Sequence, residues 1–196
     1  RLQQLLKVPQ TLKGQAILSS VKGKVKEITK NLTGGFDVRI EGYGTANDKT
    51  ITIPAGRLPV VQKGSKVTPG DRLSEGSIKP QELGDLKDHL TAQQYVVDQL
   101  DGIYDKKFYR KTFETVVRSM SDNAIVTEAP DNSGYIRGDR ASTSYLKSLN
   151  KDRKQQKLAP VRYKEYFKSV DTLNTDYDDF LTQFTTNRLK NALTTG

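Results

Sequence analysis

Residues Val67–Glu82, V-T-P-G-D-R-L-S-E-G-S-I-K-P-Q-E, separate a region of short alternating runs from a region with helical spacing. Pro69, Gly70 and Asp71 are residue types that favour turns, because proline fixes φ and glycine reaches positive φ. Apolar residues recur every second position before this stretch and every third or fourth position after it. The order predicts an α+β chain, with a small β-rich barrel or sandwich followed by helices.

The β-rich region is expected over residues 15–83. Alternating Val and Ile over residues 16–29 predict two short strands on either side of Gly23. Residues 36–40, F-D-V-R-I, and residues 49–54, K-T-I-T-I-P, alternate strictly and are divided by a glycine-containing turn. Short strands joined by such turns are typical of a small barrel.

Two helices are expected over residues 91–104 and 110–120. Each carries apolar residues three and four positions apart, which makes one apolar face. The opposite face of the second helix carries Lys111, Glu114 and Arg118. Neighbours at this spacing can form ion pairs, so these three residues are expected to form a structural row.

The segment 124–168 is predicted to be largely irregular, apart from a short strand at residues 125–127. Residues 147–168 hold eight Lys or Arg and two acids, with few apolar residues up to residue 157, which favours a loop. Tyr145 and Tyr163 lie among the cations, and such a pattern suits nucleic-acid phosphates as well as a solvated loop. A last helix is predicted over residues 174–193.

Composition narrows the functional classes. The chain of 196 residues has a net charge of +9 and no cysteine, which favours acidic partners and excludes disulfides and thiol catalysis. His89 has no nucleophile motif around it and is interpreted as a surface or capping residue. Asp176, Asp178 and Asp179 are interpreted as first-turn acids of a helix, since a helix directs the first two apart. We therefore expect no catalytic residue and no metal site in this chain.

The wider pattern K63-G-S-K followed by V-x-x-G-D-x-L also resembles biotinyl and lipoyl carrier barrels. Those domains present a lysine on a tight hairpin, typically beside methionine. No M-K-x stretch occurs here. The carrier interpretation is therefore disfavoured.

The second half of the opening stretch resembles the (T/S)-E-G-x-I-x-P-x-x-L phrase of the largest subunit, β′, of bacterial-type RNA polymerases. Further phrases follow the order of that subunit. The similar segments are R-L-Q-Q-L-L at residues 1–6, Q-A-I-L-S-S-V-K-G-K-V at 15–25, Y-V-V-D-Q-L-D-G-I-Y at 95–104, R-K-T-F-E-T-V-V-R-S-M at 110–120, F-K-S at 167–169 and T-T-N-R-L-K-N-A-L-T-T-G at 185–196. The resemblance is colinear over nearly the whole chain.

Several positions depart from the family. The loop between Tyr104 and Lys111 is shorter, the family's histidine is Thr112, and its glutamine is Ser119. This divergence resembles phage-encoded polymerases whose large subunits are split into separate chains. A cleaved fragment of a longer subunit is the alternative.

The resemblance implies roles for individual residues. Lys168 matches the lysine of switch 1, which approaches the DNA backbone, and Lys164 and Arg162 are further candidates for DNA contact. The row of Lys111, Glu114 and Arg118 would brace the active-centre floor. The Mg²⁺-binding N-A-D-F-D-G-D motif of the family is absent from this chain, so partner subunits would supply Mg²⁺ and the chemistry.

The sequence thus predicts a C-terminal β′-like subunit or fragment of a multisubunit DNA-directed RNA polymerase, acting in the bacterial or host cytoplasm. Its partners would be the remaining β′ and β-like chains, the DNA template and the RNA–DNA hybrid, without a membrane. A stand-alone basic nucleic-acid-binding protein is the alternative. The expected regions are a connector (1–14), a jaw-like module (15–83), a helical pair (84–123), an irregular basic segment (124–168) and a switch-1-like helix (169–196).

Overall fold

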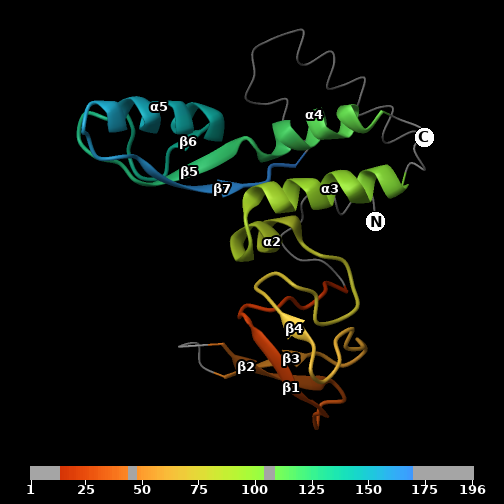
Figure 1. Ribbon diagram of the computed structural model, residues 1–196. Coiled ribbons are helices and arrows are strands. Elements are labelled where there is room, and N and C mark those ends of the chain that lie inside the picture. The colour runs from red at the N-terminus through yellow and green to blue at the C-terminus, as the bar shows by residue number, and fades with distance from the viewer. Residues whose placement is uncertain (1–13, 44–47, 104–108, 170–196) are drawn as a thin grey trace. The chain divides into compact units, whose positions relative to one another are not determined.

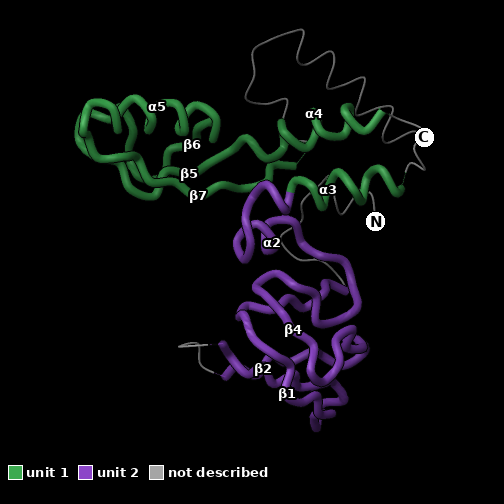
Figure 2. The backbone as a smooth tube through the Cα atoms, in the orientation of Figure 1, with its two compact units in different colours: residues 1–8, 93–196 green, residues 9–92 purple. Residues whose placement is uncertain are grey.

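The computed structural model describes residues 14–43, 48–103 and 109–169. It contains two compact units, residues 9–92 and residues 1–8 with 93–196 (Figures 1 and 2). The α+β class is confirmed. The described elements are, in chain order, β1 (Gly23–Lys30), β2 (Phe36–Gly42), β3 (Lys49–Ile53), β4 (Lys66–Val67), α2 (Pro80–Leu86), α3 (His89–Ile103), α4 (Arg110–Ser121), β5 (Asn123–Glu128), β6 (Arg140–Ala141), α5 (Thr143–Gln155) and β7 (Arg162–Tyr166).

The unit of residues 9–92 is built on an antiparallel sheet with the strand order β3-β2-β1-β4. The predicted two-residue alternation places one set of side chains inward, since successive strand residues face opposite sides. The buried cluster consists of Val25, Val38, Ile40, Ile53, Val67 and Leu73. Strands over residues 36–40 and 49–54 are therefore confirmed.

The strand expected before Gly23 is wrong. Residues 15–18 form only isolated bridges, Gln15 with Ser77 and Leu18 with Arg72. Their partners lie far along the chain, so local alternation could not reveal this pairing. Strand β1 begins at Gly23, where an added Cβ would lie 2.2 Å from the backbone oxygen of Glu41, and this close approach requires glycine.

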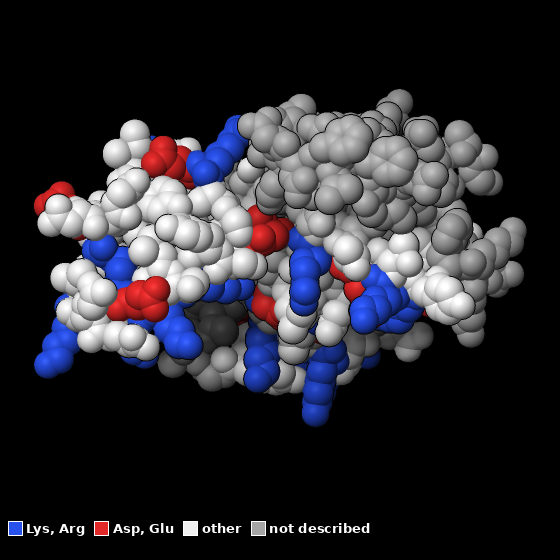
Figure 3. Space-filling view, turned by 90° about the horizontal axis from the view of Figure 1, so that it is seen from above, with Lys and Arg blue, Asp and Glu red and all other residues white. Residues whose placement is uncertain are grey.

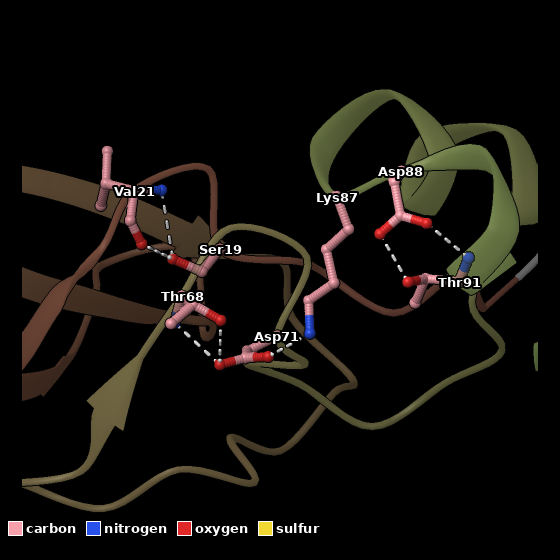
Figure 4. Close-up of polar contacts among 7 residues, drawn as sticks. All are labelled: Ser19, Val21, Thr68, Asp71, Lys87, Asp88 and Thr91. Carbon is pink, nitrogen blue, oxygen red and sulfur yellow. Dashed lines mark hydrogen bonds and ion pairs between the residues drawn. The ribbon is translucent and has the colours of Figure 1, made fainter.

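The turn within the opening stretch is fixed by Asp71. Its Oδ2 atom accepts hydrogen bonds from the Thr68 backbone N–H at 2.7 Å and the Thr68 hydroxyl at 2.9 Å, while Oδ1 pairs with Lys87 Nζ at 2.9 Å (Figure 4). Gly70 beside it has a φ of +83°. The stretch therefore turns the chain as its composition predicts, and Lys87 ties the turn to the residues that follow α2.

Helices α3 and α4 confirm the two helices expected from apolar spacing. Asp88 caps α3, since its Oδ1 atom accepts the Thr91 backbone N–H at 2.7 Å (Figure 4). His89 is the first residue of α3 and is half-buried. The side chain that caps the helix is that of Asp88, the residue before it. The apolar face of α4 is buried through Phe113, Val116, Val117 and Met120.

The unit containing residues 93–196 includes a second antiparallel sheet, with the order β6-β5-β7. Helix α5 lies along one face of this sheet in Figure 1. The small core between them holds Ala124, Val126, Leu146 and Val161. Strand β5 confirms the short strand expected at residues 125–127, and its central position makes it the only strand paired with both others in this described sheet.

Some predictions lie outside the described residues. These are the first-turn acids and helix of residues 174–193, most of the connector and the final family phrase. Within the described ranges, none of the helices combines the length and apolar character needed to cross a membrane. The division of the chain into five functional regions stays a prediction.

Candidate nucleic-acid interface

The basic stretch 147–168 is ordered secondary structure, and the prediction of an irregular segment is wrong. It contains most of α5, a short connection and β7. Ser142 caps α5 by accepting the Tyr145 backbone N–H at 3.3 Å, and Arg153 and Lys154 occupy the last turn, where cations suit the helix dipole. Helix α5 forms with few apolar residues, because Leu146 is its only fully buried apolar side chain and packs against the sheet.

Some cations of this stretch have structural partners. Lys147 Nζ lies 3.0 Å from Glu165 Oε1, and this pair joins α5 to β7. The Arg153 side chain is 6% exposed and donates from Nε to the Ala159 carbonyl at 2.7 Å and from Nη1 to the Asn132 carbonyl at 3.2 Å. Because it holds two loops against α5, Arg153 is a structural residue.

The predicted DNA-contact residues occupy one strand and the segment after it. Arg162 and Lys164 are exposed on β7, and Arg162 Nε pairs with Glu128 Oε2 at 3.4 Å. Lys168 is half-buried, and its backbone N–H donates to the Met120 carbonyl at 2.7 Å. Thus β7 brings the three residues into one continuous segment that is anchored at the end of α4.

Lys168 lies in a surrounding that disfavours its charge. Burial lowers the pKa of its ammonium group, and the nearby Arg140 guanidinium lowers it further. An anion placed between two such cations would offset their repulsion.

Sequence reasoning missed Arg140. It lies on β6, a strand of two residues, so no alternation could be recognised around it. Its pairing with Ile125 of β5 brings it into the same sheet as Lys164. Only the non-local strand pairing reveals this neighbourhood.

The expected row on α4 has different partners from those predicted. Glu114 Oε1 pairs with Arg110 Nε at 3.4 Å, one turn earlier. Lys111 and Arg118 are exposed and have no ion pair among the described residues.

Arg110 is the residue of α4 that forms ion pairs with both Glu114 on its own helix and acids on α3. Its Nη2 atom lies 2.7 Å from Asp98 Oδ1 and its Nη1 atom 3.9 Å from Asp101 Oδ2. The hydrogen bond that Arg110 donates to Asp98 is the main cause of a raised pKa of Arg110. The ion pairs therefore connect α3 to α4 instead of forming a row along one helix.

No group of three or more His, Asp and Glu side chains in the described ranges could hold a metal ion. Figure 3 shows Lys and Arg side chains with Asp and Glu side chains among them on one face of the molecule. Opposite charges are therefore interspersed on the face shown.

Comparison with known proteins places the chain beside one polymerase subunit. It is 30% identical over 130 residues to the DNA-directed RNA polymerase subunit β′ of Endomicrobium trichonymphae, covering 65% of the chain and 8% of that protein. The same subunit of Thermosipho melanesiensis is 31% identical over 140 residues, covering 70% of the chain and 8% of the relative. That of Geobacillus kaustophilus is 25% identical over 172 residues, or 86% of the chain and 14% of the relative.

These matches establish homology to a short segment of β′. The chain spans 8–14% of the length of these three relatives. No family model matches it.

Proposed function

We propose that the chain is a C-terminal β′-like subunit or fragment of a multisubunit DNA-directed RNA polymerase. The observation that carries the proposal is the homology to β′ over 65–86% of the chain. Residues 15–83 would serve as a jaw-like module beside downstream DNA. The segment from residue 169 onward would act as part of the clamp and switch region, and a phage origin would account for the divergence.

The chemistry belongs to partner chains in this proposal. The remaining β′ and β-like chains would supply Mg²⁺ and nucleotidyl transfer, and this chain would support the active centre. Lys111, Glu114 and Arg118 lie on α4, with Glu114 within the Arg110 network that joins α3 to α4. A helix pair fixed in this way could brace a neighbouring active centre.

Contact with nucleic acid would occur through Arg162, Lys164 and Lys168. The main-chain bond to Met120 fixes the position of Lys168, and the unfavourable surroundings of its ammonium group favour an anionic ligand. A DNA phosphate beside Lys168 would raise the pKa of its ammonium group towards the ordinary value. Binding and protonation of this lysine would then be coupled.

Reconstitution tests the assignment. The chain should co-purify in fixed stoichiometry with the other polymerase subunits of the same genome, and the complex should extend a primed RNA. A folded chain that binds DNA but ignores these subunits would instead support the stand-alone nucleic-acid-binding alternative.

A single substitution tests the proposed contact. Within the complex, Lys168→Ala should lower the slope of log affinity against log salt by about one, because one phosphate contact is lost. Lys154→Ala, at an exposed position in the last turn of α5, is the matched control. An unchanged slope for Lys168→Ala would remove this lysine from the interface.

A further inference from the structure

The outer face of the sheet β3-β2-β1-β4 carries two lysines directly opposite each other. Lys24 of β1 pairs in register with Lys66 of β4. Their neighbours Val25 and Val67 belong to the buried cluster, so both lysine side chains point away from it, because side chains alternate along a strand. Both lysines are exposed. Directly opposed side chains have Cβ atoms about 5 Å apart, and like charges at such positions repel each other.

The turn that leads into β4 adds a third lysine, Lys63, to this pair. The Gly64 backbone N–H donates to the Val25 carbonyl at 2.7 Å, which holds the turn against β1. A Cβ added at Gly64 would lie 3.8 Å from the Cε atom of Lys24, so the Lys24 side chain extends over the turn that carries Lys63. Lys63 is exposed as well. We call these three residues the lysine cluster: Lys24, Lys63 and Lys66.

The acids beside the lysine cluster have partners elsewhere. Lys24 also pairs in register with Glu41 of β2, but the Oε1 atom of Glu41 lies 3.8 Å from Lys26 Nζ. Asp71 follows β4, and its Oδ1 atom lies 2.9 Å from Lys87 Nζ. Both carboxylates are therefore engaged with cations outside the cluster.

The acids further along β1 and β2 are engaged too. Glu27 pairs in register with Arg39 of the neighbouring strand. The Oδ1 atom of Asp37 accepts the Thr52 hydroxyl at 2.8 Å and the Asn31 amide at 3.3 Å. Within the ranges that the structure describes, no member of the lysine cluster has an ion pair. The β4 end of the sheet therefore keeps an excess of positive charge.

We propose that the lysine cluster binds the phosphate backbone of duplex DNA without reading its sequence. A phosphate between Lys24 and Lys66 would offset their repulsion, and Lys63 would reach a neighbouring phosphate. Duplex DNA carries one negative charge per about 1.7 Å of its axis, so closely spaced cations can each meet a phosphate. The inference rests on the proposed placement of residues 15–83 beside downstream DNA, and it adds the residues that make the contact.

Duplex DNA fits the lysine cluster better than an acidic polypeptide does. Residues 62–66, Q-K-G-S-K, contain no acid and no apolar side chain that could anchor a protein partner. Lysine is depleted from protein–protein interfaces, whose centres are apolar, whereas protein–DNA interfaces are strongly positive. The ammonium group is a point charge on a flexible stem, and it therefore suits phosphates without a fixed geometry.

The test uses the full chain and a fluorescein-labelled DNA duplex, with anisotropy measured between about 50 and 200 mM salt. The double variant Lys24→Gln/Lys66→Gln should bind more weakly. Its slope of log affinity against log salt should fall by about 1.8, since each phosphate contact contributes about 0.9. The charge-conserving variant Lys24→Arg/Lys66→Arg should keep the slope, and it decides the matter if the glutamine variant fails to fold.

The matched control is Lys30→Gln/Lys151→Gln, which removes the same charge from exposed positions outside the cluster. Lys30 lies six residues beyond Lys24 along β1, or about 20 Å, and Lys151 lies on α5. This variant should leave the slope nearly unchanged.

Four results would overturn the inference. The first is a wild-type chain that does not bind the duplex at the lowest salt. The second is an equal change of slope in the cluster variant and the control, which indicates diffuse attraction. The third is a loss of slope in the arginine variant. The fourth is binding of labelled polyglutamate, but not DNA, that depends on Lys24 and Lys66.

The fate of the polymerase assignment is separate. A complex that assembles and extends a primed RNA, but whose Lys24→Gln/Lys66→Gln variant keeps the wild-type salt slope, refutes only the role of the lysine cluster. A chain that ignores the polymerase subunits, yet loses slope in the cluster variant and not in the control, refutes only the polymerase role.

Discussion

The carboxylate of Asp122, at the end of α4, accepts the hydroxyl of Ser142, the cap of α5, with 2.7 Å between Oδ2 and Oγ. Its other oxygen, Oδ1, accepts the Ser144 backbone N–H at the same distance. One side chain thus joins two helices that are separated along the chain by the β5–β6 segment. Because Ser142 also accepts the Tyr145 backbone N–H, Asp122 orients the residue that caps α5.

Replacing Asp122 should therefore destabilise the β5–β7 sheet with its helix. Asp122→Ala removes both acceptor bonds and should cost about 1–2 kcal/mol of unfolding free energy, as expected for the loss of a helix cap and its support. Urea denaturation followed by circular dichroism measures this change. Asp131→Ala, at an exposed turn position, is the control and should change the free energy by less than about 0.5 kcal/mol. Equal stability of the two variants would contradict the capping role.

Arg153 provides a second test of the same region. Arg153→Lys keeps the charge but cannot reach both carbonyls, of Ala159 and Asn132, in the geometry of a guanidinium. Because Arg153 is buried and hydrogen bonds of a charged group contribute about 1.5–3 kcal/mol, we expect a loss of stability of about this size. Lys154→Arg, at the exposed neighbouring position, should have little effect in the same urea titration. An unchanged free energy of unfolding in Arg153→Lys would show that water replaces these hydrogen bonds.

The Asp71 turn predicts a pH dependence of stability. Burial alone would raise the pKa of the Asp71 carboxyl, but the hydrogen bonds from Lys87 and Thr68 outweigh it and lower the pKa below its ordinary value. In the folded state the carboxyl thus releases its proton more readily than in the unfolded state. Its stabilisation is complete above the unfolded pKa of about 3.9 and is lost as pH falls through the folded pKa.

Asp71→Asn should reduce stability at pH 6 by about 1 kcal/mol or less, since the pair with Lys87 is partly exposed, and its effect should shrink near pH 3. Unfolding free energies of the wild type and the variant at both pH values give the comparison. Glu75→Gln, an exposed acid of the same stretch, is a suitable control. A difference between wild type and Asp71→Asn that does not depend on pH would rule out this titration.

The partners of Glu114 can be tested by comparing two arginines of α4. Arg110→Gln removes the pairs with Asp98, Asp101 and Glu114, so it should lower the melting temperature more than Arg118→Gln does. These pairs are exposed, and salt screens exposed charges. The difference between the variants should therefore diminish in concentrated salt. A larger effect from Arg118→Gln would restore the row first expected from spacing.

Local sequence patterns predicted some elements and missed others for identifiable reasons. Helix α4 was predictable because Phe113 and Val117 lie one turn apart on the same helix face and are both buried. Helix α5 was missed because it buries few apolar residues and depends on Asp122, which lies 20 residues before its cap. The surroundings of Arg140 were equally hidden, since they arise only when β6 pairs with β5.

The bridge between Gln15 and Ser77 has a consequence for rearranging the gene. It is reinforced by hydrogen bonds from the Ala16 backbone N–H to the Ser77 carbonyl at 2.9 Å and from the Ser77 backbone N–H to the Gly14 carbonyl at 3.2 Å. The segments that border the β-rich module, at residues 14–16 and at Ser77, therefore lie at neighbouring points, so a short peptide could join them. A circular permutant opened at the exposed turn after Asn31 should then keep the sheet, and the module could be transplanted as a closed cassette into another host chain.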